Sequence, residues 1–176
     1  MIEVADNNGL MAGKRGLVLG IANDHSIAYG ISRALHGAGA ELALTYQGEG
    51  FLKRVELLAQ SLDCKILLPC DVADPDSVDA LFAAISEQWG RLDFLVHAIA
   101  YSDRSELSGR YLETTRENFL QTLHISCFSF TDLARRASEL MTDGGAMLTL
   151  SFLGAHRVMP SYNVMGVAKA ALETSV

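Results

Sequence analysis

The stretch Gly16-Leu-Val-Leu-Gly20-Ile-Ala-Asn-Asp-His-Ser26-Ile-Ala-Tyr-Gly30 decides the fold. It opens with a short apolar run that ends at a glycine, as a buried strand does, and apolar residues then recur at helical spacing from Ser26 to Ala38. A strand, a tight turn and a helix in this order begin a unit in which helices connect parallel strands. Exposed N–H groups and the helix dipole at such a turn favour an anion, for example a pyrophosphate.

The rest of the chain repeats this alternation. We predict further strands over residues 41–46, 65–69, 92–98 and 146–151, and helices over 50–62, 74–89 and 114–141, with a last helix from about 162. Asp74-Pro75 marks one helix start as an N-cap followed by proline, and Thr114-Thr-Arg-Glu117 marks another as a capping box. The polar residues 101–113 are expected to form a loop over a ligand. The pattern predicts an α/β protein with a doubly wound parallel sheet, in one domain over residues 1–176.

Composition excludes several classes of function. The 176 residues carry a net charge of -7 without a basic cluster, so we expect neither nucleic acid nor a membrane surface as partner. No run approaches the roughly 20 apolar residues of a membrane span, and residues 1–13 show no secretory signal, which predicts a cytoplasmic protein. Cys64, Cys70 and Cys127 form no CxxC pair, which favours reduced thiols and gives no metal site.

The ends of the first two strands suggest a dinucleotide site, because ligands of parallel sheets gather at the carboxyl ends of the strands. Gly20 permits a tight turn, and Ser26 can cap the following helix and bind a phosphate. Gln47, after the second strand, can hydrogen-bond a ribose diol. Since residues 45–48 contain no Arg or Lys to pair with a 2′-phosphate, we predict NAD rather than NADP, although Lys53 and Arg54 lie downstream.

The next two strand ends extend the same site. Asp71-Val72 follows the third strand and can hydrogen-bond the adenine amino group and flank its ring. Ala98-Ile99-Ala100 follows the fourth strand and offers small side chains where the backbone can pass close to the nicotinamide ribose. Each segment alone could equally be a solvated loop, and their order along successive strand ends is what favours a binding site.

Tyr162 and Lys169 form a candidate catalytic pair. Seven residues are about two helical turns, so the two side chains would project within roughly 20° of each other. A nearby ammonium would lower the pKa of the phenol and prepare it to donate to an oxygen that gains negative charge. The alternative at this point is an ordinary amphipathic helix with a tyrosine and a lysine at its edge.

With the turn Gly20-x5-Ser26-Ile-Ala-Tyr-Gly30 and the spacing Tyr162-x-x-Met165-x-x-x-Lys169, the chain resembles the divergent short-chain dehydrogenase/reductases. It is most similar to the bacterial NADH-dependent enoyl-acyl-carrier-protein reductases of fatty-acid synthesis, from about Lys14 to Val176. The resemblance implies a Rossmann-like fold. Relatives that reduce ketones usually have three residues between Tyr and Lys, whereas six stand here.

The resemblance also implies roles for individual residues. Lys169 matches the lysine that binds the nicotinamide ribose, Tyr162 the tyrosine that faces the thioester carbonyl, and Ser102 a residue that touches substrate. The positions that match contacts with NAD are Gly20, Ser26, Ile27, Gln47, Asp71, Val72 and Ile99. The implied reaction is reduction of a trans-2-enoyl thioester on acyl carrier protein by NADH, with Tyr162 stabilising an enolate oxygen.

The chain departs from the family pattern in two ways. Many members carry a second tyrosine ten residues before the catalytic one, and Phe152 stands there. The family also continues well beyond the position of Val176, so the chain is expected to be an incomplete reductase that stops in the helix bearing Lys169. Members form tetramers through the 114–141 helix and the next, which implies a homo-oligomer. Two alternatives stay open: a non-catalytic nucleotide-binding or association module, and a 3-oxoacyl (ketone) reductase.

Overall fold

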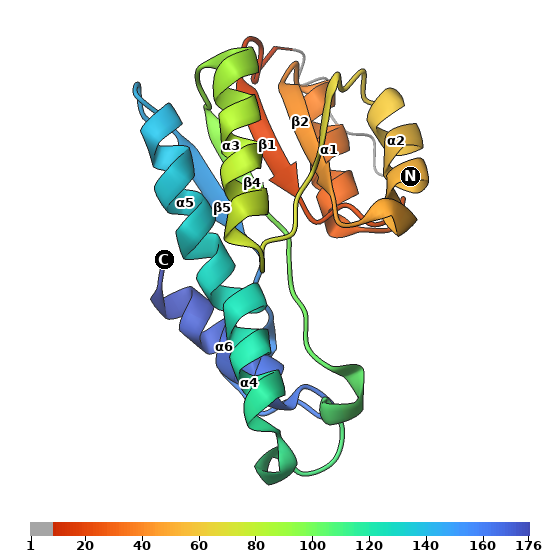
Figure 1. Cartoon of the computed structure of the whole chain (residues 1–176), viewed down its shortest axis with the longest axis vertical. Coiled ribbons are helices and arrows are strands. Elements are labelled where there is room, and N and C mark those ends of the chain that lie inside the picture. The colour runs from red at the N-terminus through yellow and green to blue at the C-terminus, as the bar shows by residue number, and fades with distance from the viewer. Residues whose placement is uncertain (1–8) are drawn as a thin grey trace. The chain divides into compact units, whose positions relative to one another are not determined.

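The computed structural model describes residues 9–176, which form a five-stranded sheet and several helices (Figure 1). The strand order is β3-β2-β1-β4-β5, and the pairs β1–β2, β2–β3 and β1–β4 are parallel. The strands are β1 (Arg15–Leu19), β2 (Glu41–Tyr46), β3 (Ile66–Pro69), β4 (Phe94–His97) and β5 (Ala146–Thr149). Because β3 and β4 lie on opposite sides of the β2–β1 pair, the chain reverses direction across the sheet, and the predicted doubly wound α/β fold is confirmed.

Six α-helices in the described part of the chain connect and follow these strands. They are α1 (Ile27–Gly37), α2 (Glu49–Gln60), α3 (Pro75–Trp89), α4 (Arg116–Leu123), α5 (Ser129–Leu140) and α6 (Asn163–Thr174). Three short 3₁₀ turns lie at Arg104–Glu106, Tyr111–Glu113 and Leu153–Ala155, and a π-helical turn, His124–Phe128, joins α4 to α5. Within residues 9–176, none of these helices has the length and apolar character that crossing a membrane requires.

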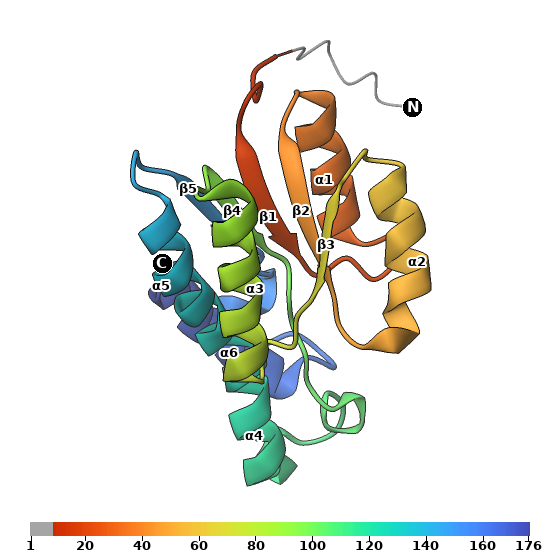
Figure 2. The same ribbon diagram turned by 45° about the horizontal axis from the view of Figure 1, so that its top comes forward.

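The inner strands are buried on both faces, as parallel sheets require when helices cover each side. Val18 and Leu44 belong to the core cluster that includes Ala28 of α1 and Val55 of α2. Leu17 points to the opposite face, since side chains alternate along a strand, and it is also fully buried. Figure 2 shows α1 and α2 on one face of the sheet and α3 on the other.

The chain forms two compact units, which are described separately. The first, here called the sheet unit, comprises residues up to 98 together with 136–148. The second, here called the helical unit, comprises residues 99–135 and 149–176. It contains α4, the π-helical turn, the 3₁₀ turns and α6. The single domain expected over residues 1–176 stays a prediction.

One of the two predicted helix starts is confirmed and the other is wrong by one residue. Asp74 caps α3, because its side chain accepts a hydrogen bond from Asp76 N at 3.1 Å. The cap of α4 is Thr115, whose Oγ1 accepts from Asn118 N at 3.2 Å, and Thr114 stands outside the helix. The carboxylate that bonds the N–H of the cap comes from Glu106 at 2.9 Å instead of from within the helix.

The helix predicted over 114–141 is present from Arg116 to Leu140, but it is not α-helical throughout. The π-helical turn at residues 124–128 separates α4 from α5. The most buried side chains of α4 are polar, Asn118 and Thr122, whereas Phe119 and Leu123 are only partly buried. The reason is a network of hydrogen bonds with the segment before α4, described below.

Candidate functional site

The turn between β1 and α1, in the sheet unit, is built for close approach of the backbone. Gly20 has a φ of +103°, and a Cβ at this position would lie 2.1 Å from the carbonyl oxygen of Ala98. Only glycine fits there. Ser26 occupies the N-cap position of α1, but its hydroxyl donates to the carbonyl of Asn23 and makes no side-chain cap, so that part of the prediction is wrong. Ile27 is 66% exposed at the first helical position.

The other predicted cofactor residues of the sheet unit follow adjacent parallel strands. Gln47 is exposed directly after β2. Asp71 follows β3, and one of its carboxylate oxygens already accepts from Ala73 N at 2.9 Å, while Val72 is buried. Arg54 of α2 brings a cation to the first turn, where its Nη1 lies 3.5 Å from the carbonyl of Ala22. A glycine cradle and polar groups at these strand ends suit a dinucleotide, whose pyrophosphate requires backbone approach.

Tyr162 lies in the helical unit at the N-cap position of α6. Its ring packs edge-on against Phe152, with ring centroids 5.0 Å apart and planes inclined at 60°. Gly154 permits this placement, because a Cβ there would come within 2.4 Å of the Tyr162 ring. The phenylalanine that replaces a second tyrosine therefore supports the ring of Tyr162 by packing.

The hydroxyl of Tyr162 makes no hydrogen bond with any residue that the structure describes. The residue lines an open cavity of about 480 Å³ in the helical unit. The other lining residues are Tyr111, Gly154, Ala155, His156, Arg157, Val158, Met159, Asn163, Gly166, Val167 and Ala170. The phenol is thus half-buried in the wall of a cavity with its donor available.

Lys169 is 5% exposed, and its Nζ donates to the carbonyl of Leu150 at 2.8 Å. Burial lowers the pKa of this amine, and the opposing influence of Cys127, in the π-helical turn, is smaller. An ammonium has three donors, so two remain beside the one that Leu150 accepts. Those two could hold the hydroxyls of a ribose.

The predicted electrostatic action of Lys169 on Tyr162 is wrong for this structure. Burial raises the pKa of the phenol above its ordinary value, and Lys169 does not contribute to the shift. The physical reason is that burial disfavours the phenolate, while the lysine is directed to a backbone carbonyl. Tyr162 is accordingly a protonated donor throughout the neutral range.

Ser102 belongs to a polar network of the helical unit that sequence reasoning missed. Its hydroxyl donates to Asn118 Oδ1 at 3.3 Å and accepts from Thr122 Oγ1 at 2.9 Å. Ser126 bonds both the N–H and the carbonyl of Tyr101, each at 2.9 Å. The spacing of Asn118, Thr122 and Ser126 at i, i+4 and i+8 was the available signal, because it places three polar groups on one face. Ile99 lies at the start of the same segment.

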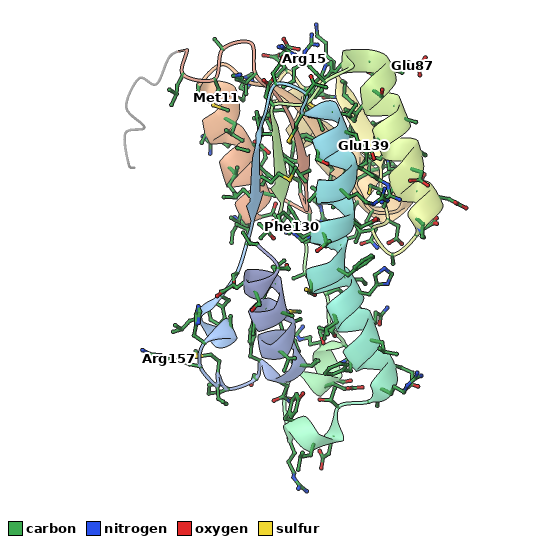
Figure 3. The ribbon with its side chains drawn as sticks, turned by 90° about the vertical axis from the view of Figure 1, so that its left-hand side faces the viewer. Met11, Arg15, Glu87, Phe130, Glu139 and Arg157 are labelled. Carbon is green, nitrogen blue, oxygen red and sulfur yellow. The ribbon has the colours of Figure 1, made fainter. Side chains whose placement is uncertain are left out.

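A second polar cluster fixes the segment that precedes Tyr162. Glu173 of α6 accepts from the hydroxyl of Ser151 and lies 2.7 Å from Nε2 of His156. Both partners belong to the chain between β5 and α6. Arg157, next to His156, points away from the ribbon into solvent (Figure 3). Glu173 therefore anchors this segment to the helix that carries Lys169.

A parallel sheet in the order β3-β2-β1-β4-β5, with a glycine turn before α1, defines a dinucleotide-binding α/β protein of the Rossmann type. The helical unit adds the phenol of Tyr162 and the buried ammonium of Lys169, the two groups to which the resemblance assigns roles. The family model described as enoyl-(acyl carrier protein) reductase matches residues 20–176, and the chain belongs to that family.

Individual relatives agree with this assignment. "Enoyl-[acyl-carrier-protein] reductase [NADH] 2" of Rhizobium meliloti is 63% identical over 169 residues, which is 96% of this chain and 63% of the relative. An enoyl-(acyl-carrier-protein) reductase of Anaplasma phagocytophilum, crystallised in complex with NAD, is 57% identical with a TM-score of 0.94, covering 96% of this chain and 64% of its own.

A Bacillus cereus enoyl-acyl carrier protein reductase, solved with NADP+ and indole naphthyridinone, is 46% identical with a TM-score of 0.93. The match covers 96% of this chain and 66% of that one. The chain thus spans somewhat less than two thirds of the length of these relatives.

Proposed function

We propose that the protein reduces trans-2-enoyl thioesters on acyl carrier protein to saturated acyl thioesters, with NADH as the reductant, in fatty-acid synthesis. The observation that carries this proposal is the joint presence, in the helical unit, of a protonated phenol without a described partner and a buried ammonium with two spare donors. The names of the relatives, which are NADH enoyl-acyl-carrier-protein reductases, support it.

Each residue has a distinct part in the proposed reaction. Gly20, Ser26 and Ile27 would hold the pyrophosphate, and Gln47, Asp71 and Val72 the adenosine, with Ile99 and Lys169 at the nicotinamide ribose. The bound cofactor supplies the hydride that reduces the double bond. Tyr162 donates a hydrogen bond to the thioester oxygen as that oxygen gains charge. Ser102 is the proposed contact for the substrate.

The decisive experiment measures NADH oxidation in the presence of a trans-2-enoyl thioester. Turnover of that substrate supports the proposal. Turnover of a 3-oxoacyl thioester instead would favour the ketone reductase, and NADH binding with no turnover of either substrate would favour the non-catalytic module.

Tyr162→Phe should lower kcat by about a hundredfold, because one donor to an oxyanion contributes on the order of 3 kcal/mol. NADH affinity should not change, and an unaltered kcat would exclude Tyr162 from this role.

The proposed preference is for NAD over NADP, on the ground that the segment after β2 offers the amide of Gln47 and no cation. Arg54 is the group that could reverse it, since its guanidinium reaches the first turn. Titration of the protein with NADH and NADPH should give tighter binding of NADH. Gln47→Arg should narrow the difference by improving NADPH binding, and equal affinities in the unaltered protein would contradict the preference.

We also propose a cytoplasmic location, supported by three free cysteines, which a reducing compartment maintains. The acyl carrier protein is the proposed macromolecular partner, as the names of the relatives imply.

A further inference from the structure

The backbone on both sides of Tyr162 is strained. Ser161 has a φ of +56° and Asn163 a φ of +32°, a region that side chains other than glycine rarely adopt and that asparagine tolerates better than most. Two such residues around one tyrosine persist only where surrounding contacts hold them. The position of the phenol therefore depends on what fixes its neighbours.

Asn163 has such contacts. Its Nδ2 donates to the carbonyl of Glu106 at 2.9 Å and lies 3.4 Å from the carbonyl of Ser108. Carbonyl oxygens only accept, so a side chain at this position must donate in order to bond them. The amide thereby ties the first residue of α6 to the 3₁₀ turn at residues 104–106.

Glu106 is itself held firmly to the start of α4. Its carboxylate accepts from Thr115 N at 2.9 Å, Thr115 Oγ1 at 2.8 Å and Asn118 Nδ2 at 3.1 Å. Asn118 bonds Ser102 through its other amide atom. One continuous hydrogen-bonded path within the helical unit thus joins Ser102, the proposed substrate contact, to the residue next to Tyr162.

We infer that Asn163 is a positioning residue, which holds the Tyr162 phenol in place by anchoring it to the segment 102–118. The inference deepens the proposed function and rests on Tyr162 being the donor to the thioester oxygen. If Asn163 had only a local role, it would do no more than begin α6, and its replacement would change hydrogen exchange in that helix alone.

Asn163→Gly removes the amide and still permits a positive φ, so it separates the tether from backbone strain. Hydrogen exchange should become about fivefold to tenfold faster at the amides of residues 102–108, as expected for the loss of one hydrogen bond. Thr174→Gly, at the far end of the same helix, is the matched control and should leave those amides unchanged. Unchanged exchange at 102–108 in Asn163→Gly would overturn the inference.

The second readout is the pKa of the Tyr162 phenol, measured by ultraviolet titration. The titration of Tyr162→Phe is subtracted, so that the signal of Tyr162 alone remains. Asn163→Gly should move the pKa of Tyr162 down toward the ordinary value of about 10, because a loosened ring gains water. If hydrogen exchange at residues 102–108 became faster while the pKa of Tyr162 stayed the same, Asn163 would only anchor the loop. That result would refute its role in positioning the phenol. Neither readout requires turnover.

Kinetics then link Asn163 to the chemistry. In the protein with Tyr162, Asn163→Gly should lower kcat roughly tenfold, because a small misplacement of the phenol causes a loss of this size. In the Tyr162→Phe background the same substitution should lower kcat less than about twofold, since no phenol is left to misplace. An equal loss in both backgrounds would refute the inference. Full activity in Tyr162→Phe would instead reject the proposed part of Tyr162 in the reaction. The exchange and titration results would still decide what Asn163 holds in place.

Discussion

Lys169 is a buried amine, and burial of a charge makes folding depend on pH. Since its pKa is lowered in the folded protein, the unfolded chain binds more protons at every pH between the folded and unfolded values. The free energy of unfolding therefore rises with pH between the folded and unfolded pKa values of Lys169. Below the folded value the buried amine is charged, and the full cost of burying the ammonium lowers the stability. The upper bound of the interval is the ordinary lysine value, about 10.4.

We predict that Lys169→Met changes the pH dependence of stability. Relative to the variant, the unaltered protein should gain stability as the pH rises through the alkaline range toward about 10.4, because the amine then loses its proton more readily when folded. Urea unfolding at a series of pH values measures the difference. Two stability curves that stay parallel would show that the buried amine does not titrate differently in the two states.

The sequence identifies Tyr162 and Lys169 by residue type and spacing, but it does not give the environment of either. Burial raises the pKa of the phenol, with Phe152 and Gly154 packed against the ring, while the Lys169 amine donates to the carbonyl of Leu150. Such contacts depend on the backbone at Ser161 and Asn163, which both have a positive φ. Asparagine tolerates that region better than most residues, but serine has no such preference, so the sequence does not predict the pair.

At the scale of elements, two adjacent threonines allow a matched comparison. Thr115→Val removes the cap of α4 and a hydrogen bond to Glu106, and should destabilise the protein by about 1–2 kcal/mol. Thr114→Val removes a buried hydroxyl that has no partner among the described residues, so it should be neutral within about 0.5 kcal/mol or stabilising. Denaturant titration of both variants measures the free energies of unfolding.

The opposite ranking of the two variants would restore Thr114 as the cap. The capping-box pattern places the start of α4 one residue early because Glu106, far outside the four-residue pattern, supplies the carboxylate. The start at Asp74-Pro75 is predicted correctly, since every group that forms it is local. The inner strands and most helices are also predicted from local signals. These strands are short continuous apolar runs, and the helices show apolar residues at helical spacing.

At the scale of the whole molecule, the helical unit exposes apolar side chains that should promote self-association. Leu120 is 51% exposed, Phe128 53% and Val167 37%. We predict that the protein sediments as a homo-oligomer and that Phe128→Glu shifts it to a smaller species. Leu57→Glu, at a 67% exposed position on α2 of the sheet unit, is the control and should have no effect.

A monomeric sedimentation coefficient for the unaltered protein would contradict this expectation. A doubly wound parallel sheet is predictable from the sequence at this scale, because strands that alternate with helices leave few topologies, but the order of the strands comes from the structure. The division into two compact units is not, since no linker or change in composition marks residues 98, 135 or 148.

The π-helical turn at His124–Phe128 amounts to one residue inserted into an otherwise regular helix. Deleting Cys127 would restore an unbroken α-helical repeat, yet each residue of an α-helix turns its neighbours by about 100°. The deletion would therefore swing the row of Asn118, Thr122 and Ser126 away from its partners while Ser129 and the residues after it kept their places. A regular α-helix and the hydrogen bonds of Asn118, Thr122 and Ser126 are thus incompatible at this turn, and the π-helical turn preserves the hydrogen bonds.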